Sequence, residues 1–494
     1  MAMSTREYVA HDAMGLAQAV QRGDTTPGEL LETALSLADA AQPALNALTV
    51  DFRDRARAQA RDLSRAEGRA RSVLAGVPFA LKDLGAALAG TVTTCGSRLL
   101  RNAEDRVTST LVQRYLDAGL VIFGRSASPE FGIHCETFSD LHGLTRNPWD
   151  LARTAGGSSG GAAALVASGV LPAAQGSDGG GSIRIPAALC GLVGLKPTRG
   201  RMPSGPMVGE GWSGLAGAHV LTRSMRDCAA FLDIAKGWEP AAPSSPENAH
   251  LTFLQSVGRM PKRALRIAVS EFGRGLCDTD PETAALLHAT AQRLSDLGHD
   301  IVATDPTIDH DEVCEVFWKI VGVNLAAEIA AEAGVPHSSV GPGGLGGPGD
   351  MIEPATAACI DAARGLSAAE FIALMWRRDA LCARFSAFFE TFDILLSPVT
   401  PVPAWPVGAL PYRGDWSDYA ARMYRAIPYT PILNLAGLPG LALPLGATRS
   451  GLPIGLQLAA GFGREDLLLG LGGVLEAEAG PGGFNRTAPA FQQS

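Results

Sequence analysis

The sequence predicts an α/β fold, in which short strands of a sheet alternate with amphipathic helices. Three apolar runs have the length of buried strands, at 77–81, 120–123 and 267–269. The amphipathic stretch 109–118 lies between the first two runs and is followed by Gly119, a residue suited to end a helix. This alternation of strand and helix signals is typical of an α/β sheet protein.

The N-terminal part of the chain is predicted to be helical. Thr26 and Glu29 have the spacing of a capping box, and Pro27 stands at the first helical position. Apolar residues follow at helical spacing, at positions 30, 31, 34 and 37. We therefore expect a helix that begins at Pro27.

Later segments divide into loops, helices and a second group of strands. Residues 239–250 are rich in Pro, Ala and Ser, and residues 335–354 are rich in Gly and Pro, which predicts two exposed loops. Beyond the first loop the pattern is mostly helical to about residue 392. Residues 395–460 return to short apolar runs separated by Pro and Gly, and we expect this part to rejoin the first sheet.

Length and charge limit the possible classes of function. The chain has 494 residues, which allows two or three domains or one unusually large domain. The net charge of −9 and the scattered Lys and Arg residues argue against nucleic acid as a direct ligand. We find no N-terminal apolar leader and no run of about 18 apolar residues, which predicts a cytoplasmic protein without a membrane partner. The eight cysteines have no C-x-x-C spacing and are expected to be reduced core thiols.

Two segments dense in glycine and serine carry the strongest chemical signal. They are residues 156–161, with the sequence GGSSGG, and residues 176–184, with the sequence GSDGGGSIR. Clustered glycines allow several backbone N–H groups to point at one position, as an oxyanion site requires. Ser182 ends the longer cluster and is therefore a candidate nucleophile.

A serine nucleophile needs a base within hydrogen-bonding reach, either a histidine or a lysine whose pKa is lowered by burial. Lys82 follows the apolar run 77–81, so the end of a strand would carry its side chain into the interior. An isolated lysine is much more often exposed than buried. From the residues alone, both interpretations of Lys82 remain open.

The motifs together resemble the amidase signature family over nearly the whole chain. Residues 74–83 are similar to the lysine segment of the family, residues 155–161 to its serine loop, and residues 176–186 to its nucleophile segment. The two serines, Ser158 and Ser182, are 24 residues apart, as in the family. Residues 191–200 and 451–457 continue the similarity. Within the family the chain is most similar to bacterial 6-aminohexanoate cyclic-dimer hydrolases, aryl acylamidases and urethane-cleaving amidases.

The resemblance implies one domain over residues 1–494, built on a twisted mixed sheet of about eleven strands with helices on both faces. A signature core would cover about 70–205, variable helices near the substrate about 251–392, and the return to the sheet about 395–470. The resemblance also implies that no metal and no organic cofactor takes part. The expected substrate is a small amide or carbamate, and the expected assembly is a monomer or homodimer.

Carried over to this sequence, the resemblance makes Ser182 the nucleophile, Ser158 the bridging serine and Lys82 the base. The bridging serine of the family follows a cis peptide bond, here Gly157–Ser158. The resemblance places the oxyanion hole at the N–H groups of Gly179, Gly180, Gly181 and Ser182. It assigns supporting roles around the triad and its loop to Gly157, Ser159, Asp178 and Arg184. One departure is Gly179, where the family usually has Thr, and we expect the lost side chain either to loosen the oxyanion hole or to widen the acyl site.

Three local motifs offer other interpretations. Residues 156–160 also spell G-x-S-x-G, which would make Ser158 the nucleophile of an esterase, but no buried strand is predicted before it. Residues 341–346 spell G-x-G-x-x-G without a preceding strand, so a dinucleotide site is not expected. His134 beside Cys135 is interpreted as packing, not as a catalytic dyad.

At the level of function the main prediction is an amidohydrolase for small hydrophobic linear or cyclic amides. A second hypothesis is the glutaminase subunit of a tRNA-dependent transamidation complex, which belongs to the same family. A third is a catalytically silent binding module, against which the intact Lys82, Ser158 and Ser182 argue.

Overall fold

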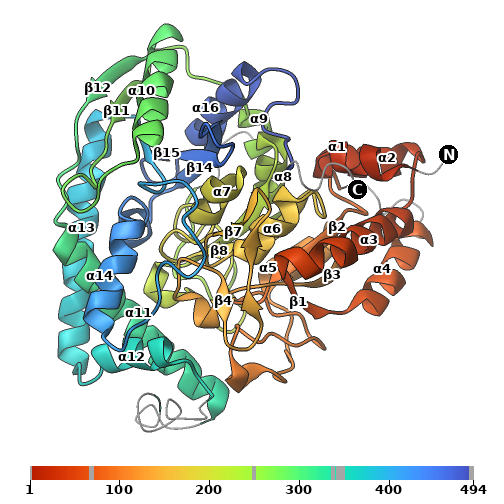
Figure 1. Cartoon of the computed structure of the whole chain (residues 1–494), viewed down its shortest axis with the longest axis horizontal. Coiled ribbons are helices and arrows are strands. Elements are labelled where there is room, and N and C mark those ends of the chain that lie inside the picture. The colour runs from red at the N-terminus through yellow and green to blue at the C-terminus, as the bar shows by residue number, and fades with distance from the viewer. Residues whose placement is uncertain (1–2, 66–71, 248–251, 335–339, 341–350, 489–494) are drawn as a thin grey trace.

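The computed structural model describes residues 3–65, 72–247, 252–334, 340 and 351–488. Its strands form two main sheets that lie edge to edge within one layered α/β unit (Figure 1). The smaller sheet has the order β1-β3-β2. β2 and β3 run parallel, and β1 pairs with β3 in the antiparallel direction. Its strands are β1 (Leu48–Asp51), β2 (Pro78–Lys82) and β3 (Val121–Ser126).

The larger sheet is mixed and has the order β12-β11-β13-β15-β14-β9-β10-β8. β12, β11 and β13 are parallel to one another, whereas the remaining pairs are antiparallel. The two sheets together contain eleven strands, the number that the family resemblance implies. The strands of the larger sheet are β8 (Ala173–Asp178), β9 (Val193–Lys196), β10 (Gly217–Thr222), β11 (Arg266–Val269), β12 (Asp300–Ala303), β13 (Ile394–Pro398), β14 (Gly440–Ala447) and β15 (Pro453–Ala460).

The two sheets meet where β2 runs beside β8, at a junction made by a side chain. The backbone N–H of Lys82, the last residue of β2, donates a hydrogen bond of 2.8 Å to Oε1 of Gln175 on β8. Gln175 in turn donates to the carbonyl of Gly176 at 2.7 Å. Both Lys82 and Gln175 are buried, so this amide satisfies a backbone donor that neither sheet ladder pairs.

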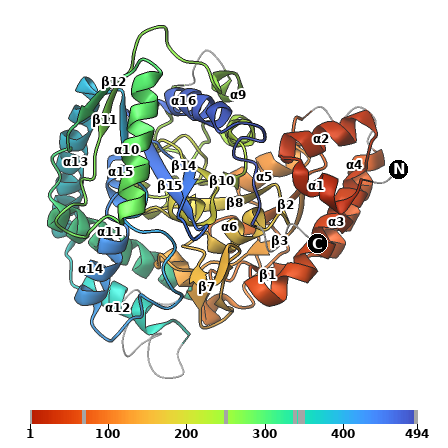
Figure 2. The ribbon, with the colours of Figure 1, turned by 45° about the horizontal axis from the view of Figure 1, so that its top comes forward.

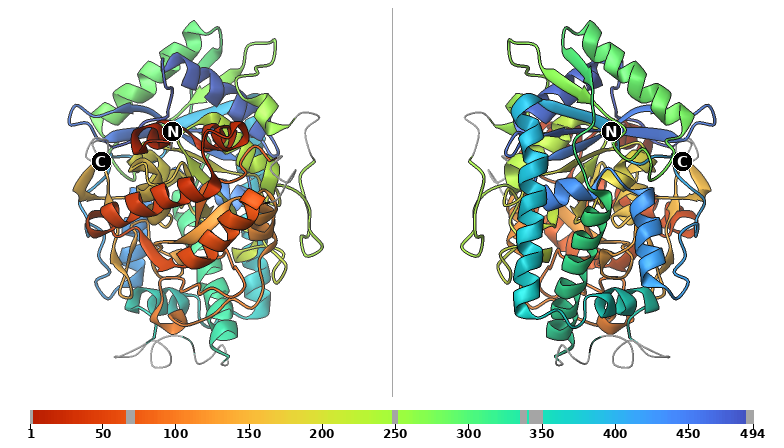
Figure 3. Two further views of the ribbon diagram at one scale, coloured as in Figure 1. Left: turned by 90° about the vertical axis from the view of Figure 1, so that its right-hand side faces the viewer. Right: turned by 90° about the vertical axis from the view of Figure 1, so that its left-hand side faces the viewer.

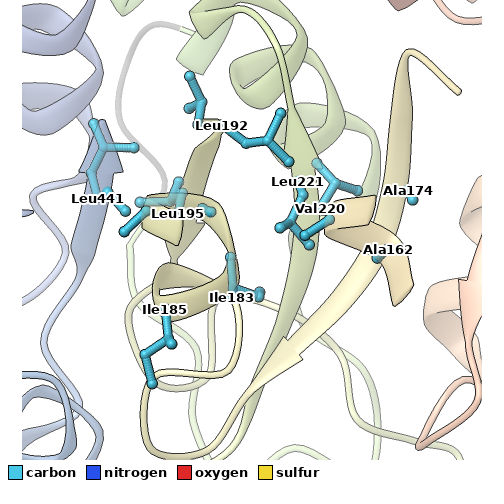
Figure 4. Packing of buried hydrophobic residues seen from close by; sticks show 14 of the residues in the cluster. Ala162, Ala174, Ile183, Ile185, Leu192, Leu195, Val220, Leu221 and Leu441 are labelled. Atoms are coloured by element: carbon cyan, nitrogen blue, oxygen red, sulfur yellow. The ribbon is translucent and has the colours of Figure 1, made fainter. Parts of the chain in front are cut away.

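Helices cover both faces of the large sheet. α6 (Gly160–Ala167) and α7 (Arg184–Cys190) lie on one face, and α8 (Met225–Ala235) and α16 (Glu465–Glu478) lie on the other (Figure 2). Figure 4 shows the packing between α6, the start of α7 and strands β8, β9, β10 and β14. Ala162, Ile183 and Leu221 are among the fully buried side chains there. This core holds both glycine- and serine-rich segments in place.

Two groups among the remaining helices lie at opposite ends of the sheet layer (Figure 3). The N-terminal group packs beside the small sheet, and α11, α13 and α14 stand side by side at the opposite end. The helices not yet given bounds are α1 (Thr5–Ala10), α2 (Ala13–Arg22), α3 (Pro27–Leu45), α4 (Arg53–Arg65), α5 (Thr110–Asp117), α9 (Phe253–Ser256), α10 (Pro281–Asp296), α11 (His310–Ala333), α12 (Pro354–Ala362), α13 (Ala368–Thr391), α14 (Trp416–Ala426) and α15 (Pro431–Ala436). Two short ribbons, β4 (Phe138–Ser139) with β5 (Gly143–Leu144) and β6 (Arg146–Asn147) with β7 (Asp150–Thr154), precede α6.

Several local expectations are confirmed, and a few are wrong. α3 begins at Pro27 with the capping box of Thr26 and Glu29 in place. The region after residue 395 supplies strands to the larger sheet and not to the smaller sheet that holds β2 and β3. It also contains α14 and α15, which the apolar-run pattern did not predict. The eight cysteines are free, although three of them, Cys277, Cys314 and Cys382, are only half-buried. In the described residues no helix is long and apolar enough to cross a bilayer.

The Gln175 junction gives a prediction about stability. Gln175→Leu removes the acceptor of the Lys82 N–H while keeping side-chain volume, so it should lower the free energy of unfolding by about 1–3 kcal/mol. Urea unfolding followed by circular dichroism measures this change. Gln292→Leu, at an exposed position of α10, is the matched control and should shift the midpoint little. Equal midpoints for Gln175→Leu and the wild type would show that the junction does not stabilise the fold.

Candidate active site

Lys82 brings a buried amine to the junction of the two sheets. Its side chain has no solvent exposure, and Nζ lies 2.7 Å from Oγ of Ser158, within hydrogen-bonding distance. Burial lowers the pKa of Lys82 to about 7, although the carboxylate of Asp178 partly opposes that shift. No carboxylate in the described part of the chain forms an ion pair with this lysine. Near neutral pH a large share of Lys82 is therefore uncharged and able to accept a proton.

Ser177 is a partner of Lys82 that the motif analysis did not identify. Its Oγ lies 2.9 Å from Lys82 Nζ. Ser177 and Gln175 are two residues apart on β8, so both point to the same face, toward β2. Alternate residues of a strand share one face, so the strand before the nucleophile could have indicated that Ser177 lies on the same face as Gln175.

The serine loop approaches the chain so closely that only glycine fits beside Ser158. The peptide bond between Gly157 and Ser158 is cis, as the family resemblance implies. A Cβ on Gly157 would lie 2.8 Å from the backbone carbonyl of Glu136. Ser159 then ties this loop to the nucleophile segment, because its N–H donates to the carbonyl of Ser182 at 3.2 Å and its Oγ donates to the carbonyl of Ser177 at 3.2 Å.

Ser182 is half-buried and lines a pocket, in contrast to the fully enclosed Lys82 and Ser158. Gly157, next to Ser158, lines the same pocket. No hydrogen bond joins the hydroxyls of Ser158 and Ser182 in the described structure. The backbone bond from Ser159 nevertheless keeps the two segments adjacent.

The predicted oxyanion donors divide into two kinds. The N–H of Gly181 donates to Oδ1 of Asp178 at 2.7 Å, so this group is engaged within the loop and is not free for a substrate, contrary to expectation. Gly181 also has φ of +130°, which favours glycine. Within the described residues no protein group accepts a hydrogen bond from the N–H of Gly179, Gly180 or Ser182. Three of the four expected donors thus remain free to bind an oxyanion.

A buried ion pair holds the nucleophile loop in this conformation. Arg184 donates to both carboxylate oxygens of Asp178, each at 2.9 Å, and both side chains are fully buried. Burial alone would raise the pKa of Asp178, but the Arg184 charge and its hydrogen bonds keep that pKa below its ordinary value. Asn434 contacts both residues, and Gln457 accepts a further hydrogen bond from Arg184 at 2.8 Å.

The pocket in front of Ser182 is walled by apolar and aromatic side chains. It is partly open to solvent, and its wall includes Trp212, Phe317, Trp318, Met423 and Ile427. None of the residues that line it is Asp, Glu, Lys or Arg. Sequence reasoning did not identify this wall, because its members come from separate segments without a shared motif.

The consequence expected from Gly179 requires a correction. The absence of a side chain at 179 does not leave room for the acyl group. The indole of Trp212 fills that space, since a Cβ on Gly179 would lie 2.7 Å from Cε3 of this ring.

The structure also bears on the other local motifs. His134 and Cys135 both line the pocket, but burial lowers the pKa of His134 to about 4 and raises the pKa of Cys135, and both shifts oppose an imidazolium–thiolate dyad. The strand before Ser158, β7, is partly exposed and belongs to a two-stranded ribbon with β6, unlike the buried strand of a nucleophile elbow. The G-x-G-x-x-G motif at 341–346 lies outside the described residues.

Among those that are described, no group of three or more His, Cys, Asp or Glu residues is placed to hold a metal ion.

Comparisons with known proteins show the family to which the chain belongs. The Amidase family model matches residues 29–469. The chain is 32% identical over 481 residues to the 6-aminohexanoate-cyclic-dimer hydrolase of Paenarthrobacter ureafaciens, covering 94% of each chain. It is 34% identical over 505 residues to a glutamyl-tRNA(Gln) amidotransferase subunit of Deinococcus deserti, covering 98% of this chain and 99% of that one.

A solved structure of 6-aminohexanoate cyclic dimer hydrolase complexed with substrate superposes with a TM-score of 0.88 at 30% identity. The alignment covers 98% of this chain and 99% of that one. The match therefore extends over both sheets and over the helices at each end. The chain belongs to the amidase signature family, whose members include hydrolases of carbon–nitrogen bonds.

Proposed function

We propose that the protein is an amidohydrolase that cleaves linear or cyclic amide bonds, and carbamates, of small hydrophobic substrates through an acyl-enzyme on Ser182. The observation that carries the proposal is the buried Lys82, which lies 2.7 Å from Ser158 and has its pKa lowered to about 7 by burial. A neutral amine in hydrogen-bonding contact with a serine is a general base. The apolar pocket in front of Ser182 supports an uncharged substrate.

The proposed proton path runs from Ser182 through Ser158 to Lys82, and the contact of 2.7 Å between Ser158 and Lys82 supports its second step. The proton of the Ser182 hydroxyl passes to Ser158, whose own proton moves to the neutral Nζ of Lys82. The Ser182 oxygen attacks the amide carbonyl, and the N–H groups of Gly179, Gly180 and Ser182 stabilise the developing oxyanion, each by about 3 kcal/mol.

Collapse of the tetrahedral intermediate breaks the carbon–nitrogen bond. Ser158 gives its proton to the leaving amine and recovers one from the Lys82 ammonium, which restores the neutral base. Water then adds to the acyl-enzyme by the same path in reverse, and Ser182 leaves with its proton. The products are a carboxylic acid and an amine, or a carbonic acid monoester and an amine when the substrate is a carbamate.

A glutaminase subunit is the second candidate, supported by the full-length similarity to a component of a glutamyl-tRNA(Gln) amidotransferase. Free glutamine carries an α-ammonium and an α-carboxylate, which require charged or strongly polar partners in a binding site. No charged residue lines the pocket in the described structure. This observation favours the stand-alone amidase.

The substrate preference is directly testable. With equal enzyme, we expect kcat/KM for a hydrophobic acyl anilide to exceed that for glutamine by about two orders of magnitude or more, because burying the two charges of glutamine without partners is costly. Carbamates and esters should also be hydrolysed. Release of aniline and of ammonia measures the two rates. A higher kcat/KM for glutamine, or a requirement for a second chain, would favour the glutaminase.

The lowered pKa of Lys82 predicts an alkaline rise in rate. Below pH 7 the amine is protonated and cannot act as a base, so log kcat/KM should increase with pH and level off above a midpoint near the Lys82 pKa of about 7. Lys82→Ala should lower kcat/KM by about three orders of magnitude. Its residual activity should not increase with pH.

The control for this profile is Lys196→Gln. Lys196 is a second buried lysine whose pKa burial lowers to about 7, and its Nζ donates to the carbonyl of Pro197 at 2.8 Å. Because Lys196 does not contact either serine, its variant should keep the midpoint of the rate profile. If kcat/KM no longer increases with pH in Lys196→Gln but still does so in Lys82→Ala, Lys82 is not the base.

Ser177 is expected to position Lys82 without taking part in proton transfer. Its hydroxyl accepts a hydrogen bond from the ammonium form and so stabilises that form. Ser177→Ala should therefore move the midpoint of the rate profile to lower pH and reduce kcat by about tenfold. The exposed Ser64→Ala serves as control. An unchanged midpoint in Ser177→Ala would show that Ser177 has no such effect on Lys82.

A further inference from the structure

Two of the glycines before Ser182 are each covered by an aromatic ring. A Cβ added to Gly179 would lie 2.7 Å from Cε3 and 2.8 Å from Cζ3 of Trp212. A Cβ added to Gly180 would lie 2.6 Å from Cζ of Phe317. Both rings line the pocket into which Ser182 faces. The wall of the pocket thus rests directly on the loop that carries the oxyanion donors.

The glycine at 179 is required by this ring and not by the backbone. Gly179 does not have a left-handed φ, unlike Gly181 in the same loop. A residue with a side chain would adopt the backbone of Gly179 without strain. The contact with Trp212 is therefore what excludes a side chain at this position.

Trp212 is held in place from several sides. Trp212 and Ser213 have φ of 50° and 52°, an uncommon backbone conformation for residues with side chains. Asn324 of α11 donates to Oγ of Ser213 at 3.0 Å, and the Ser213 carbonyl accepts a hydrogen bond of 2.9 Å from Arg378 of α13. These contacts fix the backbone from which the indole extends.

We infer that Gly179 and Trp212 form a matched pair that determines which acyl group the enzyme accepts. The inference rests on the proposed function, in which the acyl group binds in this pocket during attack by Ser182. A side chain at 179 would displace the indole and so narrow the pocket that this ring lines. A smaller residue at 212 would open space above the oxyanion loop that a side chain at 179 could fill again.

The pair also indicates a substrate class. Trp212, Phe317 and Trp318 present rings to the pocket, and the ring centroids of Phe317 and Trp318 are 5.0 Å apart in an edge-on arrangement. Such a wall is suited to a flat or cyclic uncharged acyl group that contacts the rings over its whole face. Small acyl groups such as acetyl would not reach the wall and should be insensitive to it.

A double-mutant cycle with two substrates tests the pair. The variants are Gly179→Ala, Trp212→Leu and the double variant, and the substrates are acetanilide and cyclohexanecarboxanilide, which share a leaving group. We expect Gly179→Ala to lower kcat/KM for cyclohexanecarboxanilide by at least about tenfold, and for acetanilide by less than about threefold. Adding Trp212→Leu should recover most of the loss with the larger substrate, so the two changes are not additive.

The matched control is Gly217→Ala. Gly217 pairs with Asp178 across β10 and β8, close to the same loop, but a Cβ there would meet no atom within 4 Å. This variant should keep both rates. A parallel cycle on the urea unfolding midpoint measures the packing of 179 against 212 without reference to activity, and we expect Gly179→Ala to be less destabilising when Leu replaces Trp212.

The outcomes are distinguishable. Equal losses with both anilides in Gly179→Ala, or additive effects in the double variant, would overturn the inference. If the wild type hydrolyses neither anilide, the proposed function is refuted. The unfolding cycle would still test the packing of 179 against 212. Additive changes in the unfolding midpoint would refute that packing.

Discussion

The arrangement of the site depends on the buried ion pair between Asp178 and Arg184. Asp178 is the last residue of β8 and Arg184 the first of α7, so the pair closes the turn that carries Ser182. Asp178 also accepts hydrogen bonds from the N–H groups of Gly181 and Ile183, which gives the turn one conformation. Burying two charges is costly, and a hydrophobic pair of the same volume is often as stable. The ion pair is therefore best understood as fixing the direction of the free N–H groups, not as a source of stability.

The same ion pair leaves Lys82 without a carboxylate partner. Asp178 is the negative charge that acts on Lys82 most strongly, but its oxygens are taken by Arg184, Asn434 and the loop amides. Lys82 is left with hydroxyl partners on Ser158 and Ser177. Burial without a paired carboxylate favours the neutral amine. The structure thus separates one ion pair, which holds the loop, from one unpaired lysine, which can accept a proton.

Much of this arrangement could be predicted from local sequence, and the remainder depends on contacts distant in the chain. Thr26 and Glu29 act within one helical turn, so the start of α3 was predictable. Lys82, Ser158 and Ser182 were singled out because each lies in a segment that resembles a motif of the family. β12 was missed because its apolar run, at 301–303, is short and its residues are only partly buried. The contact of Trp212 with Gly179 joins distant positions through a backbone turn with positive φ, for which no local pattern exists.

The most direct test is to locate the covalent adduct formed by a phosphonofluoridate or a slowly hydrolysed carbamate. The protein is labelled, digested and mapped by mass spectrometry, with the Ser182→Ala and Ser158→Ala variants treated in parallel. The account predicts an adduct on Ser182 in the wild type, slow labelling of the same residue in Ser158→Ala, and none in Ser182→Ala. An adduct on Ser158, or undiminished acylation of Ser182→Ala, would contradict it.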